Sequence, residues 1–100
     1  MTNEKFTPGE WKVFHQKDEF MKFFDWREIV TKETPPKALA HIMYYEEMPQ
    51  EEYEANAALI AAAPEMYRML MRLTEFTDYS ELVGIIADAK SVLKKARGEE

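Results

Sequence analysis

The first half of the chain alternates apolar and polar residues in the manner of β-strands. After the turn-forming pair Pro8-Gly9, the segment WKVFHQ places Trp11, Val13 and His15 on one side of an extended backbone. Residues 38–46, ALAHIMYYE, alternate in the same way, but both sides are largely apolar. This pattern predicts a strand at the centre of a sheet.

Residues 18–32 leave two interpretations open. Phe20, Phe24 and Trp26 would share one face of a strand, whereas Phe20, Phe23 and Phe24 would form a helical stripe. The aromatic content favours a strand. Any such strand must end before Pro35-Pro36, because proline cannot donate to a sheet ladder.

The pattern becomes helical from Gln50 onward. Residues 50–63 are apolar around the whole helix, which is typical of a buried helix. Pro64 lacks an amide hydrogen and would cost about 3 kcal/mol inside a helix, so it predicts a restart. The second helix, residues 64–76, then has an apolar stripe that consists of Met66, Met69, Leu70 and Leu73.

A third helix has clear signals at both ends. Asp78 and Glu81 form a capping-box pattern before it, and Gly98 follows it as a natural stop. Its two adjacent apolar faces run through Leu82, Val83, Ile86 and Leu93, and through Ile85, Ala89, Val92 and Ala96. A small sheet covers about one stripe of each helix, roughly 100° of arc. The surplus apolar surface predicts a homodimer.

Together these elements predict an α+β fold in a single domain, residues 1–100. The expected antiparallel sheet has three or four strands at about residues 10–46, and two or three helices at about residues 50–97 pack against it. One hundred residues are too few for two independent cores.

The composition of the chain argues against several classes of function. The net charge of −6 argues against direct nucleic-acid binding, which relies on cations that neutralise phosphates. The chain has no cysteine, so neither a disulfide nor a thiolate metal site is expected. No apolar run reaches the roughly 20 residues that span a bilayer, and the polar start does not resemble a signal peptide. We therefore expect no membrane association and a cytoplasmic location.

Catalytic constellations are weak throughout the sequence. His15 and His41 are the only histidines and could meet across a sheet, but they lack a recognisable ligand spacing. The three glycines are too scattered for a phosphate loop, and no serine or cysteine triad can be assembled. We expect no enzyme activity, no metal and no cofactor.

Two charged regions are candidates for binding. The stretch YYEEMPQEEYE combines glutamates with tyrosine anchors, and its candidate partner-binding residues are Tyr44, Tyr45, Glu46, Glu47, Glu51, Glu52 and Tyr53. The helix dipole alone also accounts for acidic residues at this position. For a phosphate ligand, the candidates near the aromatic region are Arg27, Lys32 and Lys37.

Two segments resemble a known group of proteins. FTPGEW at residues 6–11 resembles a TPG-x-W opening, and ANAALIAAAPE at residues 55–65 resembles an ANA-x-LIAAAPE segment. In this order the segments are similar to small phage and prophage proteins of unknown function, in which a few strands precede helices. Phe6 and Glu10 depart from the histidine and proline usual in that opening. The resemblance implies no catalytic residue.

The resemblance implies a small non-enzymatic accessory protein encoded by a phage or prophage. We expect such a protein to bind a host protein of defence or metabolism and to inhibit or redirect it. An alternative is a sponge that sequesters a nucleotide immune signal. A third hypothesis is a minor structural or assembly protein, although no coiled-coil pattern is present.

Overall fold

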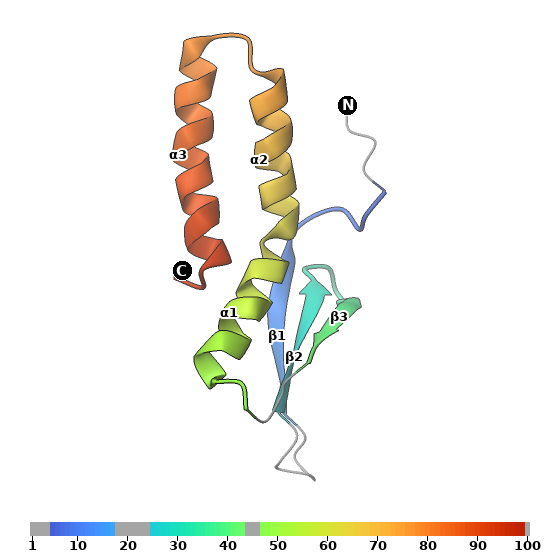
Figure 1. Ribbon diagram of the computed structural model, residues 1–100. Helices are drawn as coiled ribbons and strands as arrows, with labels where there is room; N and C mark the ends of the chain where they lie inside the picture. Colours follow the sequence, from blue (N-terminus) through green and yellow to red (C-terminus); the bar gives the residue numbers. More distant parts are fainter. Residues whose placement is uncertain (1–4, 18–24, 44–46, 100) are drawn as a thin grey trace.

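The chain forms a three-stranded sheet followed by three helices, the α+β fold that the sequence predicts (Figure 1). The computed structural model describes residues 5–17, 25–43 and 47–99. Its elements are β1 (Trp11–Lys17), β2 (Asp25–Thr31), β3 (Ala38–Ile42), α1 (Gln50–Ala61), α2 (Ala63–Glu75) and α3 (Tyr79–Ala96). Of the ambiguous stretch, the part from Asp25 to Thr31 is strand, and residues 18–24 lie outside the described residues.

The sheet is antiparallel, with strand order β1-β2-β3. The prediction that residues 38–46 form the central strand is wrong, because β2 is central and β3 is an edge strand. Burial explains the order. β2 contains Ile29 and Val30, which are 0% and 4% exposed, whereas Ile42 is the one residue of β3 classed as buried. The apolar residues on both sides of the 38–46 segment therefore did not indicate burial on both sides.

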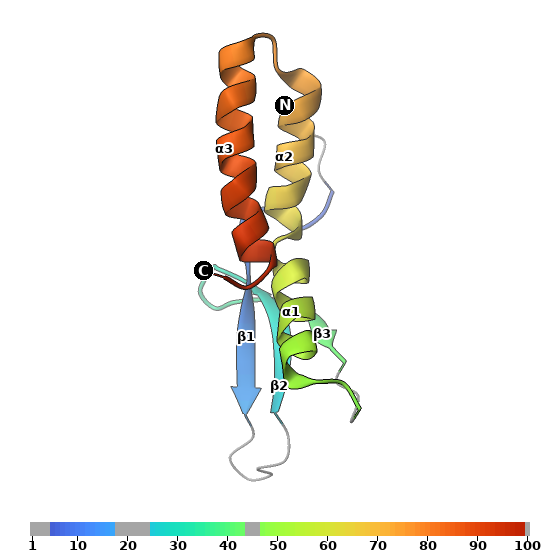
Figure 2. The ribbon, with the colours of Figure 1, turned by 60° about the vertical axis from the view of Figure 1, so that its left-hand side comes forward.

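Helix α1 covers one face of the sheet, as two views agree (Figures 1 and 2). Tyr53, Ala57 and Ala61 recur every four residues along α1, and they pack on Ile29 and Ile42. The prediction of a helix buried all round is wrong, because Leu59 on the outer side is 50% exposed. The sheet and the end of α3 cover only part of α1 and leave its outer side open.

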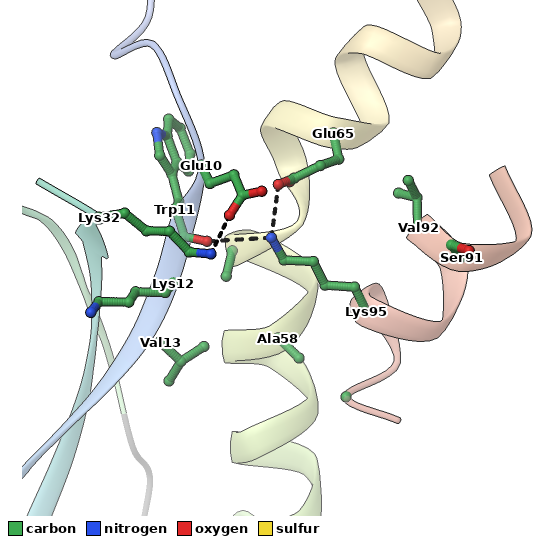
Figure 3. A pocket seen from close by; sticks show the side chains of 12 residues that line it. Glu10, Trp11, Lys12, Val13, Lys32, Ala58, Glu65, Ser91, Val92 and Lys95 are labelled. Atoms are coloured by element: carbon green, nitrogen blue, oxygen red, sulfur yellow. Dashed lines mark hydrogen bonds and ion pairs between the residues drawn. The ribbon is translucent and has the colours of Figure 1, made fainter. Parts of the chain in front are cut away.

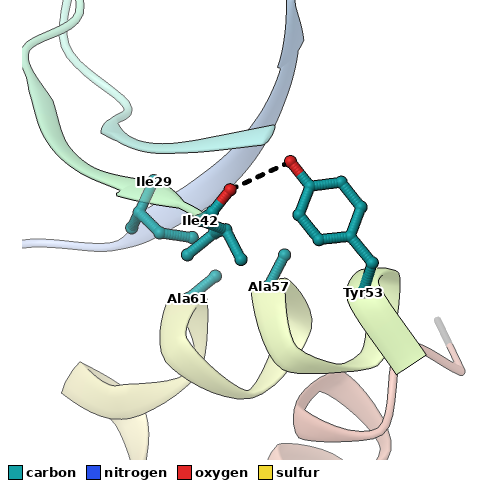
Figure 4. Close-up of a cluster of buried hydrophobic side chains, with 5 residues drawn as sticks. All are labelled: Ile29, Ile42, Tyr53, Ala57 and Ala61. Carbon is teal, nitrogen blue, oxygen red and sulfur yellow. Dashed lines mark hydrogen bonds between the residues drawn. The ribbon is translucent and has the colours of Figure 1, made fainter. Parts of the chain in front are cut away.

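The Tyr53 hydroxyl bonds to the backbone of two neighbouring strands, and Figure 4 shows its bond to Ile42 of β3. It accepts a hydrogen bond from the backbone N–H of Arg27 (2.7 Å) and donates one to the carbonyl oxygen of Ile42 (3.1 Å). Arg27 and Ile42 are opposite each other in the β2–β3 register. The hydroxyl therefore occupies the place of a ladder hydrogen bond, and it fixes α1 on the sheet.

The helix ends follow the local signals. Pro64 is in the first turn of α2, which confirms the restart, and Ala62 is the only residue between α1 and α2. The Asp78 side chain accepts a hydrogen bond from the amide of Glu81 at the start of α3. Gly98 adopts a positive φ of 74°, and the amides of Gly98 and Glu99 bond to the last carbonyls of α3, the usual glycine C-cap arrangement.

Helices α2 and α3 form an antiparallel hairpin that extends beyond the sheet (Figure 2). The chain measures 56 × 28 × 18 Å, and its radius of gyration is 16.2 Å. A compact domain of this length has a radius of gyration of about 13 Å. The protruding hairpin accounts for the difference and leaves much of its surface outside the fold.

Candidate functional site

The acidic candidate surface is only partly retained in the structure. Glu47, Glu51 and Glu52 are exposed at or just before the start of α1, and within the described part of the chain their side chains make no ion pair or hydrogen bond. Tyr53 does not belong to this surface, because it is 1% exposed and lies in the core. Tyr44, Tyr45 and Glu46 lie outside the described residues. We call Glu47, Glu51 and Glu52 the acidic surface.

Of the three candidate phosphate-binding residues, Lys32 and Lys37 line one cavity of about 220 Å³, and Arg27 lies apart from them. Arg27 is 7% exposed, its guanidinium lies over the Tyr53 ring, and it bonds to the carboxylate of Glu54 at 2.8 Å. This hydrogen bond lowers the pKa of Glu54 below its ordinary value. Lys32 pairs with Glu10 and Lys37 with Glu33. Five residues of extended chain, about 16 Å, separate Arg27 from Lys32.

One side of the α2–α3 hairpin is apolar and open to solvent. Two leucines of α2 and three aliphatic residues of α3 form it, and each is between 42% and 64% exposed. These residues, which we call the apolar side of the hairpin, are Leu70, Leu73, Val83, Ile86 and Leu93. Neighbouring members are three or seven residues apart within each helix, which places them in one stripe per helix.

The opposite side of the hairpin is polar and faces the sheet. Arg72 pairs with Asp88 at 2.7 Å and Lys95 pairs with Glu65 at 2.8 Å, so two ion pairs link the helices there. Lys95 also donates to the carbonyl oxygen of Trp11 in β1. At 100° per residue, Leu70 and the stripe of α3 lie about 120–180° from the paired residues of their own helices, and Leu73 lies about 80–100° from those of α2. The hairpin therefore has one polar and one apolar side.

A cleft of about 540 Å³ lies where β1, α1 and the end of α3 meet (Figure 3). Trp11, Val13 and Ala58 form part of its apolar wall. Four charged residues lie at its rim as two ion pairs, namely Lys32–Glu10 and Lys95–Glu65. The hydrogen bond and the charge of Lys32 lower the pKa of Glu10. The Glu65 Oε2 atom is buried and has no hydrogen-bond partner.

The two histidines do not meet. His15 is opposite Arg27 and His41 is opposite Glu28 in the sheet register, so their side chains are on opposite faces. His41 instead bonds to Glu28 at 3.0 Å. Over residues 5–17, 25–43 and 47–99, no group of three or more histidine and acidic side chains could hold a metal ion.

Sequence reasoning identified the apolar surplus of α3 but not the side that remains open. Ile85 and Ala96 of the second predicted face are buried, and Val83, Ile86 and Leu93 of the first are exposed. Leu70 was expected in the stripe of the second helix, yet it is 64% exposed. The signal for an exposed apolar side is that α3 has two apolar faces, whereas along most of its length it has only one neighbouring helix.

The fold, the acidic surface, the apolar side of the hairpin and the cleft together define a small α+β protein. The whole chain, residues 1–100, matches the family model described as Salmonella phage P22 protein Y8K6, and the chain belongs to this family. It is therefore a small phage protein. No curated protein and no solved structure matches the chain. None of the helices in the described residues is long and apolar enough to cross a bilayer.

Proposed function

We propose that this phage protein is a non-enzymatic accessory protein that acts in the host cytoplasm by binding other protein chains, as a homodimer. The apolar side of the hairpin carries the proposal. Isolated exposed apolar residues are normal on a protein surface, but contiguous patches are characteristic of interaction sites. Here five large aliphatic side chains, each at least 42% exposed, share one side of a protruding hairpin.

The acidic surface is the proposed contact with a host protein of defence or metabolism, which would thereby be inhibited or redirected. Glu47, Glu51 and Glu52 have no cation near enough to pair with them in the described residues. A basic patch on a partner would neutralise them, and the net charge of −6 would steer such a partner toward the chain.

Affinity capture from host lysate tests the host contact. The informative variant is Glu51→Gln/Glu52→Gln, which leaves the hairpin unchanged. The matched control, Glu33→Gln/Glu99→Gln, removes the same charge from exposed residues outside α1 and the hairpin helices, whose exposed ion pairs contribute little to stability. We expect the wild type and the control to capture the same host protein, and the first variant to lose it. Capture should also weaken as salt rises from 50 to about 300 mM, because salt screens exposed charges. Equal capture by all three proteins would refute the contact.

The cleft gives the nucleotide sponge some support as a second candidate. Trp11 offers a stacking surface there, and Lys12 lines the cleft beside Lys32 and Lys95. Two of these three lysines already pair with carboxylates, which weakens the attraction for phosphate. A melting temperature that rises with the concentration of a cyclic di- or trinucleotide, and does not rise in Lys12→Ala, would favour the sponge over host-protein binding.

A further inference from the structure

We propose that a second copy of this chain covers the apolar side of the hairpin, with the two hairpins antiparallel in a four-helix bundle. This inference rests on the proposed homodimer and names its interface and its geometry. Leu70, Leu73 and Ile86 of one copy would lie against the same residues of the other, since a two-fold axis brings one patch onto itself.

The surface area of the chain supports a second copy as the occupant. The accessible surface is 7749 Å² for a mass of 11.8 kDa. A monomer of that mass usually exposes about 5,900 Å², so this chain exposes roughly 1,800 Å² more than expected. A standard stable interface buries about 800 Å² on each partner. The surplus is therefore large enough to supply a full dimer interface.

The shape of the chain leaves room for this pairing. The polar side of the hairpin contacts the start of β1 through Lys95 and Arg68, which bond to the carbonyl oxygens of Trp11 and Gly9. The sheet is thus attached on the side opposite to Leu70 and Ile86. At 1.5 Å per residue, α2 and α3 are about 20 and 27 Å long, which gives a face of suitable length for helix packing.

The distribution of charge along the hairpin favours an antiparallel arrangement of the two copies. The tip of the hairpin carries three carboxylates and no cation over residues 75–81, namely Glu75, Asp78 and Glu81. Toward its base, Lys90 and Lys94 of α3 have no ion-pair partner in the described part of the chain. Antiparallel hairpins place the acidic tip of each copy near the lysines of the other, whereas parallel hairpins place the two acidic tips together.

Light scattering on the purified full chain, from 1 to about 200 μM, tests the interface. We expect about twice the 11.8 kDa chain mass at the upper concentrations. Leu70→Glu and Ile86→Glu should each weaken dimerisation by at least about a hundredfold, because they bury a charge in the interface. The control Ser91→Glu places the same charge at an exposed position five residues further along α3, about 140° around the helix, and should retain the dimer.

Circular dichroism separates loss of the dimer from loss of the fold. Leu70→Glu and Ile86→Glu replace side chains that are 64% and 47% exposed in the single chain, so their helical signal should be unchanged. A wild type that is monomeric at 200 μM would overturn the proposal. So would a dimer that persists in both glutamate variants, because it would have to use another surface. Neither result affects the lysate test, in which the hairpin is intact.

Disulfide formation tests the orientation, because the chain has no cysteine of its own. Tyr79→Cys is at the tip of the hairpin and Lys94→Cys is near its base. An equimolar mixture of the two variants should cross-link rapidly, and each variant alone should cross-link at least tenfold more slowly. Rapid cross-linking of each variant with itself would show parallel hairpins and overturn the antiparallel arrangement.

Discussion

Replacing Tyr53 by Phe removes one buried oxygen atom and its hydrogen bonds to the backbone of Arg27 and Ile42. The ring itself remains, so packing against Ile29 and Ile42 is kept. The backbone N–H of Arg27 and the carbonyl of Ile42 lose their shared partner. Tyr53 is 1% exposed, and water is therefore excluded from replacing its hydroxyl without local opening.

The expected cost follows from these two groups. An unsatisfied buried donor or acceptor costs about 1–3 kcal/mol, so two of them would cost about 2–6 kcal/mol. The strands can move closer and form one direct bond between Arg27 and Ile42, which would recover part of this cost. We therefore expect Tyr53→Phe to lower the free energy of unfolding by about 3 kcal/mol, a large fraction of the stability of a small domain.

Urea unfolding at one fixed protein concentration measures the effect, because dimerisation would make stability depend on concentration. The matched control is Tyr79→Phe, whose side chain is 78% exposed and should change stability by less than about 0.5 kcal/mol. Hydrogen exchange at the Arg27 amide should accelerate in Tyr53→Phe. A loss below about 0.5 kcal/mol with unchanged exchange would show that the hydroxyl does not hold the strands.

Two further changes test the junction of the hairpin with the sheet and the start of α3. Lys95→Met should lower the free energy of unfolding by about 2 kcal/mol, because Glu65, 18% exposed at its side chain, loses its cation. The control Lys5→Met, at an exposed lysine outside the hairpin, should be nearly neutral in the same urea titration. Asp78→Ala should lower the melting temperature at pH 7, since the side chain accepts hydrogen bonds from Ser80 and the Glu81 amide. These bonds lower the pKa of Asp78 from its ordinary value of 3.8, so its contribution is present above pH 3.8 and is lost as pH falls through the lowered value. The difference between wild type and Asp78→Ala should shrink at pH 3, and a constant difference would contradict the cap.

Local sequence signals predict the positions of most helices and strands. They do not predict which distant segments pair with each other. Asp78 and Gly98 mark the ends of α3 through bonds to their own neighbours, so a single sequence discloses them. Strand order depends on which segments meet, and an apolar run such as residues 38–42 looks alike at the edge and at the centre of a sheet. The number and antiparallel arrangement of strands could be predicted, but the central position of β2 could not.

At the candidate site, too, local signals were predictable and contacts between distant segments were not. The glutamates that flank Tyr53 predict a surface position for it, but the structure places it in the core. Its spacing of four and eight residues from Ala57 and Ala61 was the signal that it belongs to the buried stripe of α1. For α3, both faces are apolar, and only the placement of α2 decides that Ile85 is buried and Ile86 is exposed.

The elongation of the chain sets the reach of an antiparallel pair. One chain is 56 Å long, with the acidic surface at the start of α1 and the hairpin extending away from it. Pairing through antiparallel hairpins would place the two acidic surfaces at opposite ends of the assembly. Such a pair suits targets that present two equivalent sites tens of ångströms apart, as oligomers and filaments do. Simultaneous engagement of both sites would then raise avidity by up to about 10²–10⁴ with no stronger individual contact.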